Sequence, residues 1–277
     1  MRPPEETPNG PLHSSGSTFT VLVFSKTQGY RHSSISAGVL ALEELAKASE
    51  SSLIPFHIHA TEDAIVFNPV AQNYPGPKPP PLTYRVIVFL QSSGEFLDNE
   101  AQLSALEGFV QGGGGVVGIH CASTGLPSST FYGSLIGAVF TDHPDPQKGT
   151  VVVEAPSHPI LSGTAVPEST VKRAVAVSTP GNLTAKDNVA TQFEWFDEWY
   201  NFKANPRAAG AHVLLTVKEA TYKGGTMGED HPVAWCQDRQ DSRSFYTALG
   251  HFDDAYRDPR FMRIIRNAIM WTARVSI

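Results

Sequence analysis

The sequence predicts a doubly wound α/β fold, in which helices cover both faces of a mostly parallel sheet. Continuous apolar runs, typical of strands buried on both faces, occur at 19–25, 84–90 and 116–119. Stretches with helical spacing of apolar residues separate these runs. Alternation of strands with helices is the pattern of a parallel sheet wound in both directions.

The first half of the chain supplies the alternating elements. In order, we expect a strand at 19–25, a helix from Ser33 or Ser34, a strand at 56–60, a surface loop at 74–82, a strand at 84–90, a helix from Asn99, a strand at 116–119 and a helix at 128–139. The helix from Asn99 has clear boundaries, because Gln102 completes a capping box and the glycines at 112–115 end the helix. The prolines of 74–82 fix φ and remove hydrogen-bond donors, which excludes regular structure there.

The second half is expected to be rich in strands, at 151–155, 171–177, 193–202, 213–217, 233–236 and 245–249. A final helix begins with Asp258 as its cap and Pro259 in its first turn. Residues 1–17 are rich in Pro, Ser and Gly, and we expect a disordered leader there. A single domain over 18–277 follows, because no internal repeat or long linker divides it.

The composition describes a folded chain with few charges. The 277 residues carry a net charge of -6, and 41% are hydrophobic, which excludes a disordered protein. An isoelectric point near 5.9 argues against nucleic-acid binding, because phosphates need clustered Lys and Arg. The sequence has no apolar run of the roughly 20 residues that span a bilayer, and no secretion signal. Its two cysteines fit a reducing compartment. We therefore expect a cytoplasmic protein with a small-molecule partner and no nucleic acid or membrane.

The segment 112–123 is the most informative part of the sequence. In α/β enzymes with a nucleophile elbow, a strand ends in G-x-Nuc-x-G, and small flanking residues let a strained turn expose the central side chain. Here Gly118 and Ala122 occupy the small positions and His120 is central. An imidazole there can act as a general base, a general acid or a metal ligand. The alternative is a core histidine whose nitrogens bind the backbone.

Cys121 follows His120 and has two interpretations. It is a small buried side chain, as free cysteines usually are. Alternatively, it is the nucleophile of a cysteine hydrolase or amidotransferase with a shifted elbow, which requires a reactive thiolate of low pKa.

Further candidates follow other predicted strands. The loop after the first strand offers Tyr30, Arg31 and His32, and the last predicted strand leads to His251. Loops at the carboxyl ends of strands in open α/β sheets line the ligand crevice, so these residues are expected near His120. The plainer alternatives are a surface ion pair for Arg31 and core packing for Tyr30.

Glu198 lies between Trp195 and Trp199, and carboxylates among aromatic residues suit a sugar ligand. Aromatic rings stack on the apolar CH face of a sugar, while its hydroxyls need acceptors. Core packing is the alternative for the two tryptophans. The sequence has no C-x-x-C or H-x-x-x-H zinc motif, so a divalent metal ion requires dispersed ligands. The candidates are His32, His120, His143 or His251 together with Glu198.

Seven motifs in order along the chain resemble the ThuA-like (trehalose-utilisation) family: GYRHSSI, GGGVVGIHCAS, DHP, SHPI, DEWY, HPVAW and FYTALGH. The resemblance covers roughly 18–277, and the family belongs to the class I glutamine amidotransferase-like superfamily. It implies a flavodoxin-like three-layer sandwich with a site at the carboxyl edge of the sheet, and a homodimer. Amidotransferase and peptidase relatives carry a cysteine at the elbow, where this chain has His120, so the resemblance does not extend to their activity.

The resemblance also implies the site residues. We expect a catalytic role, by proton transfer or metal ligation, for His120, His251, Glu198 and His32. We expect substrate binding by Tyr30, Arg31, His143, Trp235 and Arg243.

The expected function is therefore in carbohydrate metabolism. An enzyme would act on a neutral disaccharide or keto-sugar related to trehalose, by His/Glu acid–base or metal-assisted chemistry without a cysteine nucleophile at the elbow. The alternatives are a non-catalytic sugar-binding or regulatory module on the same fold, and a cysteine hydrolase or amidotransferase that uses Cys121.

Overall fold

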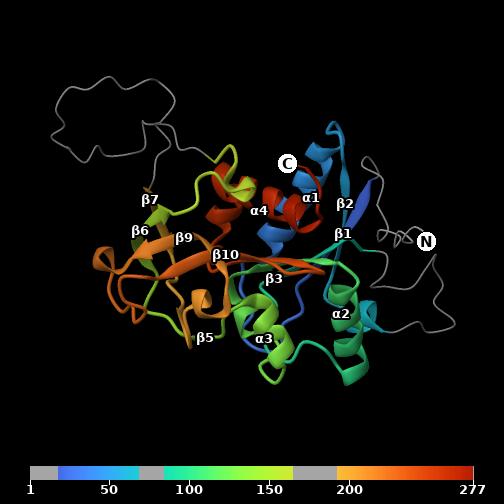
Figure 1. The fold of residues 1–277 in the computed structure, drawn as a ribbon, viewed down its shortest axis with the longest axis horizontal. Helices are drawn as coiled ribbons and strands as arrows, with labels where there is room; N and C mark the ends of the chain where they lie inside the picture. The colour runs from blue at the N-terminus through green and yellow to red at the C-terminus, as the bar shows by residue number, and fades with distance from the viewer. Residues whose placement is uncertain (1–17, 69–83, 165–191, 277) are drawn as a thin grey trace, which may run out of the picture.

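A computed structural model describes residues 18–68, 84–164 and 192–276 (Figure 1). The expected leader at 1–17, the Pro-rich loop at 74–82 and the strand at 171–177 lie outside the described residues.

One large sheet forms the centre of the described fold. Its strands are β1 (Phe19–Phe24), β2 (Phe56–Thr61), β3 (Val86–Leu90), β4 (Gly115–Ile119), β6 (Gln147–Val153), β7 (Gln192–Asp197), β9 (His212–Lys218), β10 (Pro232–Asp238) and β11 (Arg243–Thr247). They lie in the order β2-β1-β3-β4-β11-β10-β9-β6-β7. A separate antiparallel pair joins β5 (Phe140–Asp142) to β8 (Asn201–Phe202).

The sheet is parallel in one half and antiparallel in the other. Pairing is parallel from β2 to β11 and antiparallel from β11 to β7. The mixed α/β class is confirmed, but the sheet is not mostly parallel as the sequence predicted. Strands joined by a short connection, such as β10 and β11, can only run antiparallel, because a parallel pair needs a long crossover.

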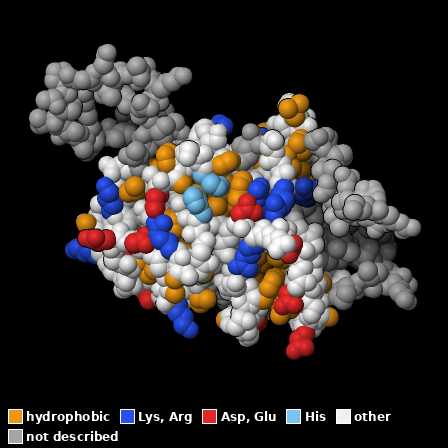
Figure 2. Space-filling view, viewed as in Figure 1, with side chains coloured by type: hydrophobic (Ala, Val, Ile, Leu, Met, Phe, Trp, Pro, Cys, Tyr) orange, Lys and Arg blue, Asp and Glu red, His pale blue; other side chains and the backbone are white. Residues whose placement is uncertain are grey.

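Helices cover both faces of the parallel half (Figure 1). α1 (Ile35–Ser49) and α4 (Pro259–Thr272) lie together on one face, and α2 (Glu100–Gln111) and α3 (Thr130–Ile136) lie on the other. None of the helices in the described ranges is long and apolar enough to cross a membrane. On the face drawn in Figure 2, acidic and basic side chains are interspersed rather than gathered by sign.

The helix boundaries agree with their sequence signals. The Asn99 side chain accepts a hydrogen bond from the Gln102 N–H at the start of α2. The Gln102 side chain accepts in turn from the Asp98 N–H, one residue earlier than in the predicted capping box. Asp258 caps α4 by accepting from the backbone N–H groups of Arg260 and Phe261.

The strand expected at 193–202 is interrupted. β7 ends at Asp197, and the chain enters the second sheet as β8. The Asp197 carboxylate accepts hydrogen bonds from the backbone N–H groups of Glu198, Gly250 and His251, and so takes the backbone out of the large sheet at this point. The alternating aromatic residues favour one continuous strand, but this break directs Glu198 toward the loop after β11.

Candidate functional site

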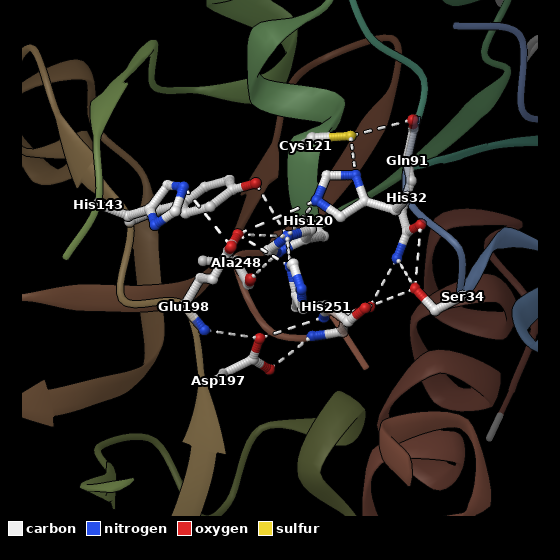
Figure 3. Close-up of polar contacts among 12 residues, drawn as sticks. His32, Ser34, Gln91, His120, Cys121, His143, Asp197, Glu198, Ala248 and His251 are labelled. Carbon is white, nitrogen blue, oxygen red and sulfur yellow. Dashed lines mark hydrogen bonds and ion pairs between the residues drawn. The ribbon is translucent and has the colours of Figure 1, made fainter. Parts of the chain in front are cut away.

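Four side chains from distant segments meet at one edge of the large sheet (Figure 3). His32 follows β1, His120 follows β4, His251 follows β11 and Glu198 follows β7. Four antiparallel pairings separate β11 from β7, so β7 points the same way as the parallel strands and its carboxyl end lies at their carboxyl edge. One ligand atom from each side chain lies within 4.8 Å of the others. We name these four residues the His/Glu cluster; they could hold a divalent metal ion.

The turn at His120 has the strained geometry that the elbow spacing predicts. His120 has a φ of 54°, in the left-handed region that residues other than glycine rarely adopt. A Cβ atom on Gly118 would lie 2.9 Å from the Ile136 Cδ1 and 3.1 Å from a ring carbon of Tyr246, so a larger side chain would have to displace the Ile136 side chain. The Tyr246 hydroxyl also donates to the His120 carbonyl, at 2.7 Å, and so holds the turn.

The hydrogen bonds of the His120 ring define which nitrogen faces the cluster. Its Nδ1 lies 2.6 Å from the carbonyl oxygen of Ala248, which can only accept, so Nδ1 carries the proton. Nε2 faces the cluster, and the Tyr200 hydroxyl lies 2.9 Å from it. The same Nε2 lies 3.2 Å from His32 Nε2 and 3.3 Å from His251 Nδ1.

Glu198 contacts every histidine around it and is only 7% exposed. Its Oε2 lies 2.9 Å from His251 Nδ1, 3.3 Å from His120 Nε2 and 4.0 Å from His32 Nε2. Burial acts to raise the pKa of Glu198, but hydrogen bonds with the three histidines outweigh it and hold the pKa far below its usual range. The carboxylate is therefore ionised at neutral pH.

His32 is the histidine of the cluster whose charge the surroundings disfavour. Burial lowers its pKa, and the nearby imidazoles of His120 and His251 lower it further, against the opposing effect of Glu198. The cluster thus combines an ionised carboxylate with a neutral imidazole, which are the protonation states that bind metals and accept protons.

Cys121 supports His32 instead of facing the cluster. Its thiol donates to the carbonyl oxygen of Gln91 at 3.0 Å, and its sulfur lies 3.4 Å from His32 Nδ1. Burial raises the pKa of the Cys121 thiol, so the reactive thiolate that a cysteine hydrolase needs is not favoured.

A network beneath the cluster joins the loops that carry it. The Gln91 side chain donates to the carbonyl oxygen of Gly250 at 2.6 Å and to Ser34 Oγ at 3.0 Å. Ser34 Oγ donates to the carbonyl oxygen of His251. Sequence reasoning missed Gln91 as well as Tyr200, although Gln91 follows a predicted strand and Tyr200 belongs to the DEWY motif.

Tyr30 and His143 lie beside the cluster, where their side chains reach solvent. The Tyr30 ring centre lies 4.7 Å from that of His32, and Tyr30 is 71% exposed. His143 Nε2 lies 3.6 Å from Glu198 Oε1, and its ring stacks on that of Tyr200. Both residues are therefore placed where sequence reasoning expects substrate binding.

The structure does not bring the other three expected substrate-binding residues to the cluster. Arg31 forms an exposed two-pronged ion pair with Glu62, the surface alternative. Trp235 is 0% exposed and donates its indole N–H to a backbone carbonyl of α3, because aromatic residues of central strands fill the core. Arg243 stacks its guanidinium 4.6 Å from the centre of the Trp271 ring, against α4.

The family model described as trehalose utilisation (ThuA) matches residues 20–172 and 167–272. The chain belongs to the ThuA family. Membership of the ThuA family indicates a carbohydrate-related role. No curated protein matches the chain.

Solved structures share the fold of this ThuA protein at low sequence identity. A ThuA-like protein from Bacteroides uniformis is 20% identical with a TM-score of 0.65, and the match covers 96% of this chain and 95% of that chain. One from Parabacteroides merdae is 14% identical with a TM-score of 0.62, covering 92% and 90%. A cytoplasmic protein from Salmonella typhimurium is 12% identical with a TM-score of 0.52, covering 91% and 98%.

Proposed function

We propose that this ThuA protein is an enzyme of carbohydrate metabolism that acts on a neutral disaccharide or keto-sugar related to trehalose. The observation that carries the proposal is the meeting of His32, His120, His251 and Glu198 at the carboxyl edge of the sheet. This edge is where open α/β sheets bind ligands. The trehalose-utilisation description of the family supports a sugar as the ligand.

A cavity beside the loop that carries His251, lined by none of the four cluster residues, supports a sugar-sized substrate. Its volume is about 520 Å³, within the range of small-molecule sites, and its aromatic lining consists of Trp195, Phe196 and Phe252. Phe252 follows His251 in the chain, and the two ring centres lie 4.3 Å apart. Such rings suit the apolar CH face of a sugar.

The charges around the cavity favour a neutral sugar over a phosphorylated one. The charged residues that line it are Glu194, Asp253, Asp254, Asp258 and Arg260. The single cation is already paired, because Arg260 binds Asp258 at 2.6 Å. An excess of carboxylates over cations repels a phosphate, whereas carboxylates accept hydrogen bonds from sugar hydroxyls.

Proton transfer is the chemistry that these side chains support. In the absence of a metal ion, neutral His32 can accept a proton from a sugar hydroxyl or from a carbon next to a keto group, while ionised Glu198, 2.9 Å from His251 Nδ1, orients that imidazole. Tyr30 and His143 would bind the sugar from the exposed side. Arg31 and Arg243 have no part in this mechanism, because surface or core partners hold them.

The finer features of the fold belong to the same proposal. The parallel strands have the order β2-β1-β3-β4-β11, which is the flavodoxin-like order. This order supports a flavodoxin-like three-layer sandwich with a strand-rich second half, and membership of the class I glutamine amidotransferase-like superfamily. The homodimer and the cytoplasmic location stay predictions.

The test is turnover of defined sugars. Purified protein is incubated with trehalose, with other neutral disaccharides and with their oxidised keto derivatives, and products are followed by chromatography with mass detection. We expect one class to be consumed by the native protein and by the surface variant His57→Ala, but not by Glu198→Gln. Sugar binding without any product would favour the non-catalytic sugar-binding module instead.

A further inference from the structure

We infer that His32, His120, His251 and Glu198 form a binding site for one divalent first-row transition metal ion, with more ligand positions than the protein fills. Ligation by these residues does not depend on the identity of the sugar. A metal site here would deepen the proposed function, because the His/Glu cluster would then contribute a bound metal ion to the reaction.

The first support is the crowding of polar atoms around His120 Nε2, which hydrogen bonds cannot satisfy. His120 Nε2 faces the cluster because Nδ1 donates to the carbonyl of Ala248. Around this atom, at 3.2 to 3.3 Å, lie His32 Nε2, His251 Nδ1 and Glu198 Oε2. A ring nitrogen has one proton or one lone pair, so hydrogen bonds cannot satisfy all these contacts at once. A cation between the four atoms satisfies all of them.

The second support is the set of distances between ligand atoms. With metal–ligand bonds of about 2.1 Å, neighbouring ligands are about 3.0 Å apart in an octahedron and about 3.4 Å apart in a tetrahedron, and opposite octahedral ligands are about 4.2 Å apart. His251 and Glu198 lie 2.9 Å apart, and His120 lies 3.2 to 3.3 Å from each of the other three. His32 and Glu198 lie 4.0 Å apart.

These distances fit an octahedron better than a tetrahedron. The 4.0 Å separation fits opposite positions for His32 and Glu198, with His120 as a neighbour of both and His251 as a neighbour of Glu198 and His120. A tetrahedron has no opposite ligands, so it does not fit this pair. Two of the six positions then remain for water or for substrate oxygens, as a catalytic metal site requires.

The third support is the chemistry of the donors. Three imidazoles with one carboxylate favour transition ions such as Zn²⁺, Fe²⁺, Co²⁺ or Ni²⁺ over Mg²⁺ and Ca²⁺, which prefer oxygen ligands. Outer contacts orient the donors in the manner of metal sites. The Ala248 carbonyl fixes the His120 ring, the Cys121 sulfur lies against His32 Nδ1, and Asp197 holds the backbone of both Glu198 and His251.

A metal ion in the His/Glu cluster would give new roles to Tyr200 and His143. The Tyr200 hydroxyl lies 2.9 Å from His120 Nε2, the atom that a metal ion would bind. This hydroxyl would then be available to an oxygen bound at an open position. His143 Nε2 lies 3.6 Å from Glu198 Oε1, with its side chain reaching solvent. Tyr200 and His143, rather than the four ligands, would therefore carry protons during the reaction.

The test measures metal content and stability rather than turnover. Protein treated with a chelator is dialysed against Zn²⁺, Co²⁺, Mn²⁺ or Ni²⁺, and bound metal is counted by mass spectrometry of the elements. We expect close to one ion per chain and a rise in Tm for at least one ion. A native protein that holds no stoichiometric metal and shows no change in Tm with any of them would overturn the inference.

Matched variants locate the site. Glu198→Gln keeps the size of the side chain, and His251→Ala removes the most exposed of the three histidine ligands. Both are expected to bind metal about tenfold more weakly or worse, while His57→Ala, at an exposed position of β2, binds like the native protein. Unchanged affinity in both cluster variants would place the ion elsewhere and refute the site.

Co²⁺ also reports the geometry. We expect the weak visible absorption of a six-coordinate ion, and the strong absorption of a tetrahedral ion would refute the open coordination sphere. Metal binding with no sugar consumed would leave this inference standing and remove the proposed function. Sugar turnover by a metal-free protein would do the opposite.

Discussion

The side-chain carboxylate of Asp197 holds the backbone of His251: its Oδ1 accepts the His251 N–H at 3.1 Å and its Oδ2 accepts the Gly250 N–H at 2.9 Å. The same carboxylate accepts from the Glu198 N–H and from the indole N–H of Trp195. One buried group thus sets the positions of two members of the His/Glu cluster that lie 53 residues apart along the chain.

Asp197→Asn is expected to destabilise the protein and to weaken the site. The amide retains one acceptor oxygen in place of two, so buried N–H groups lose their partner, at a cost of about 2 to 4 kcal/mol. Urea unfolding measures this loss. Asp241→Asn, at an exposed position, is the control and should change the free energy of unfolding by less than about 0.5 kcal/mol. An equal effect of both substitutions would contradict the role of Asp197.

Cys121→Ala is expected to leave sugar turnover largely intact. The thiol only donates to a backbone carbonyl and supports His32, so its loss should reduce stability by about 1 kcal/mol without abolishing the reaction. Initial rates for the native and variant proteins at equal concentration provide the measurement. Complete loss of turnover in a variant that unfolds at nearly the native Tm would instead identify a cysteine enzyme.

Gly118→Ala is expected to destabilise the elbow. The added Cβ would approach Ile136 Cδ1 to 2.9 Å in a packed core, and such overpacking costs about 1 to 3 kcal/mol. The matched control is Gly108→Ala in α2, where a Cβ would meet nothing within 4 Å. That change should stabilise the protein by about 0.5 to 1 kcal/mol, since alanine is the better helix former. Denaturation midpoints with opposite shifts would support both assignments, and equal shifts would contradict them.

His158 is expected to make the protein less stable in acid. Burial first, and then the neighbouring His212 and Arg243, lower the pKa of His158 to about 4. An unfolded chain has the ordinary pKa of about 6.5, so it binds a proton at His158 more readily than the folded protein does. The free energy of unfolding should therefore fall as the pH drops from about 6.5 toward 4.

The variant His158→Asn isolates this effect. His158 Nδ1 accepts the Ile160 N–H at the start of a short helical turn, and asparagine can replace that acceptor without titrating. The stability difference between native and variant protein, measured by urea unfolding at several pH values, should decrease between pH 6.5 and 4. A difference that does not change with pH would contradict the assignment.

Local signals in the sequence were sufficient to predict the residues around which the site is built. The apolar runs located β1, β3 and β4, and the crevice rule then brought His32, His120 and His251 together. The elbow spacing also predicted the strained backbone of His120, because a glycine two residues before it indicates a turn with little room for a side chain.

What the sequence could not predict depends on partners far away in the chain. The break after β7 follows from hydrogen bonds between Asp197 and residues 250 and 251, which no local pattern contains. Arg31 was expected at the site because its loop is there, but its side chain turns to Glu62. The sequence does not show whether Trp235 stacks on a sugar or packs in the core, since an aromatic residue in a strand has the same sequence pattern in both cases.

Glu198 comes from the antiparallel half of the sheet, while the three histidines come from the parallel half. The His/Glu cluster needs residues from both halves, so two fragments made by splitting the protein between them are expected to have no partial activity. A movement of one half of the sheet relative to the other should for the same reason separate Glu198 from the three histidines.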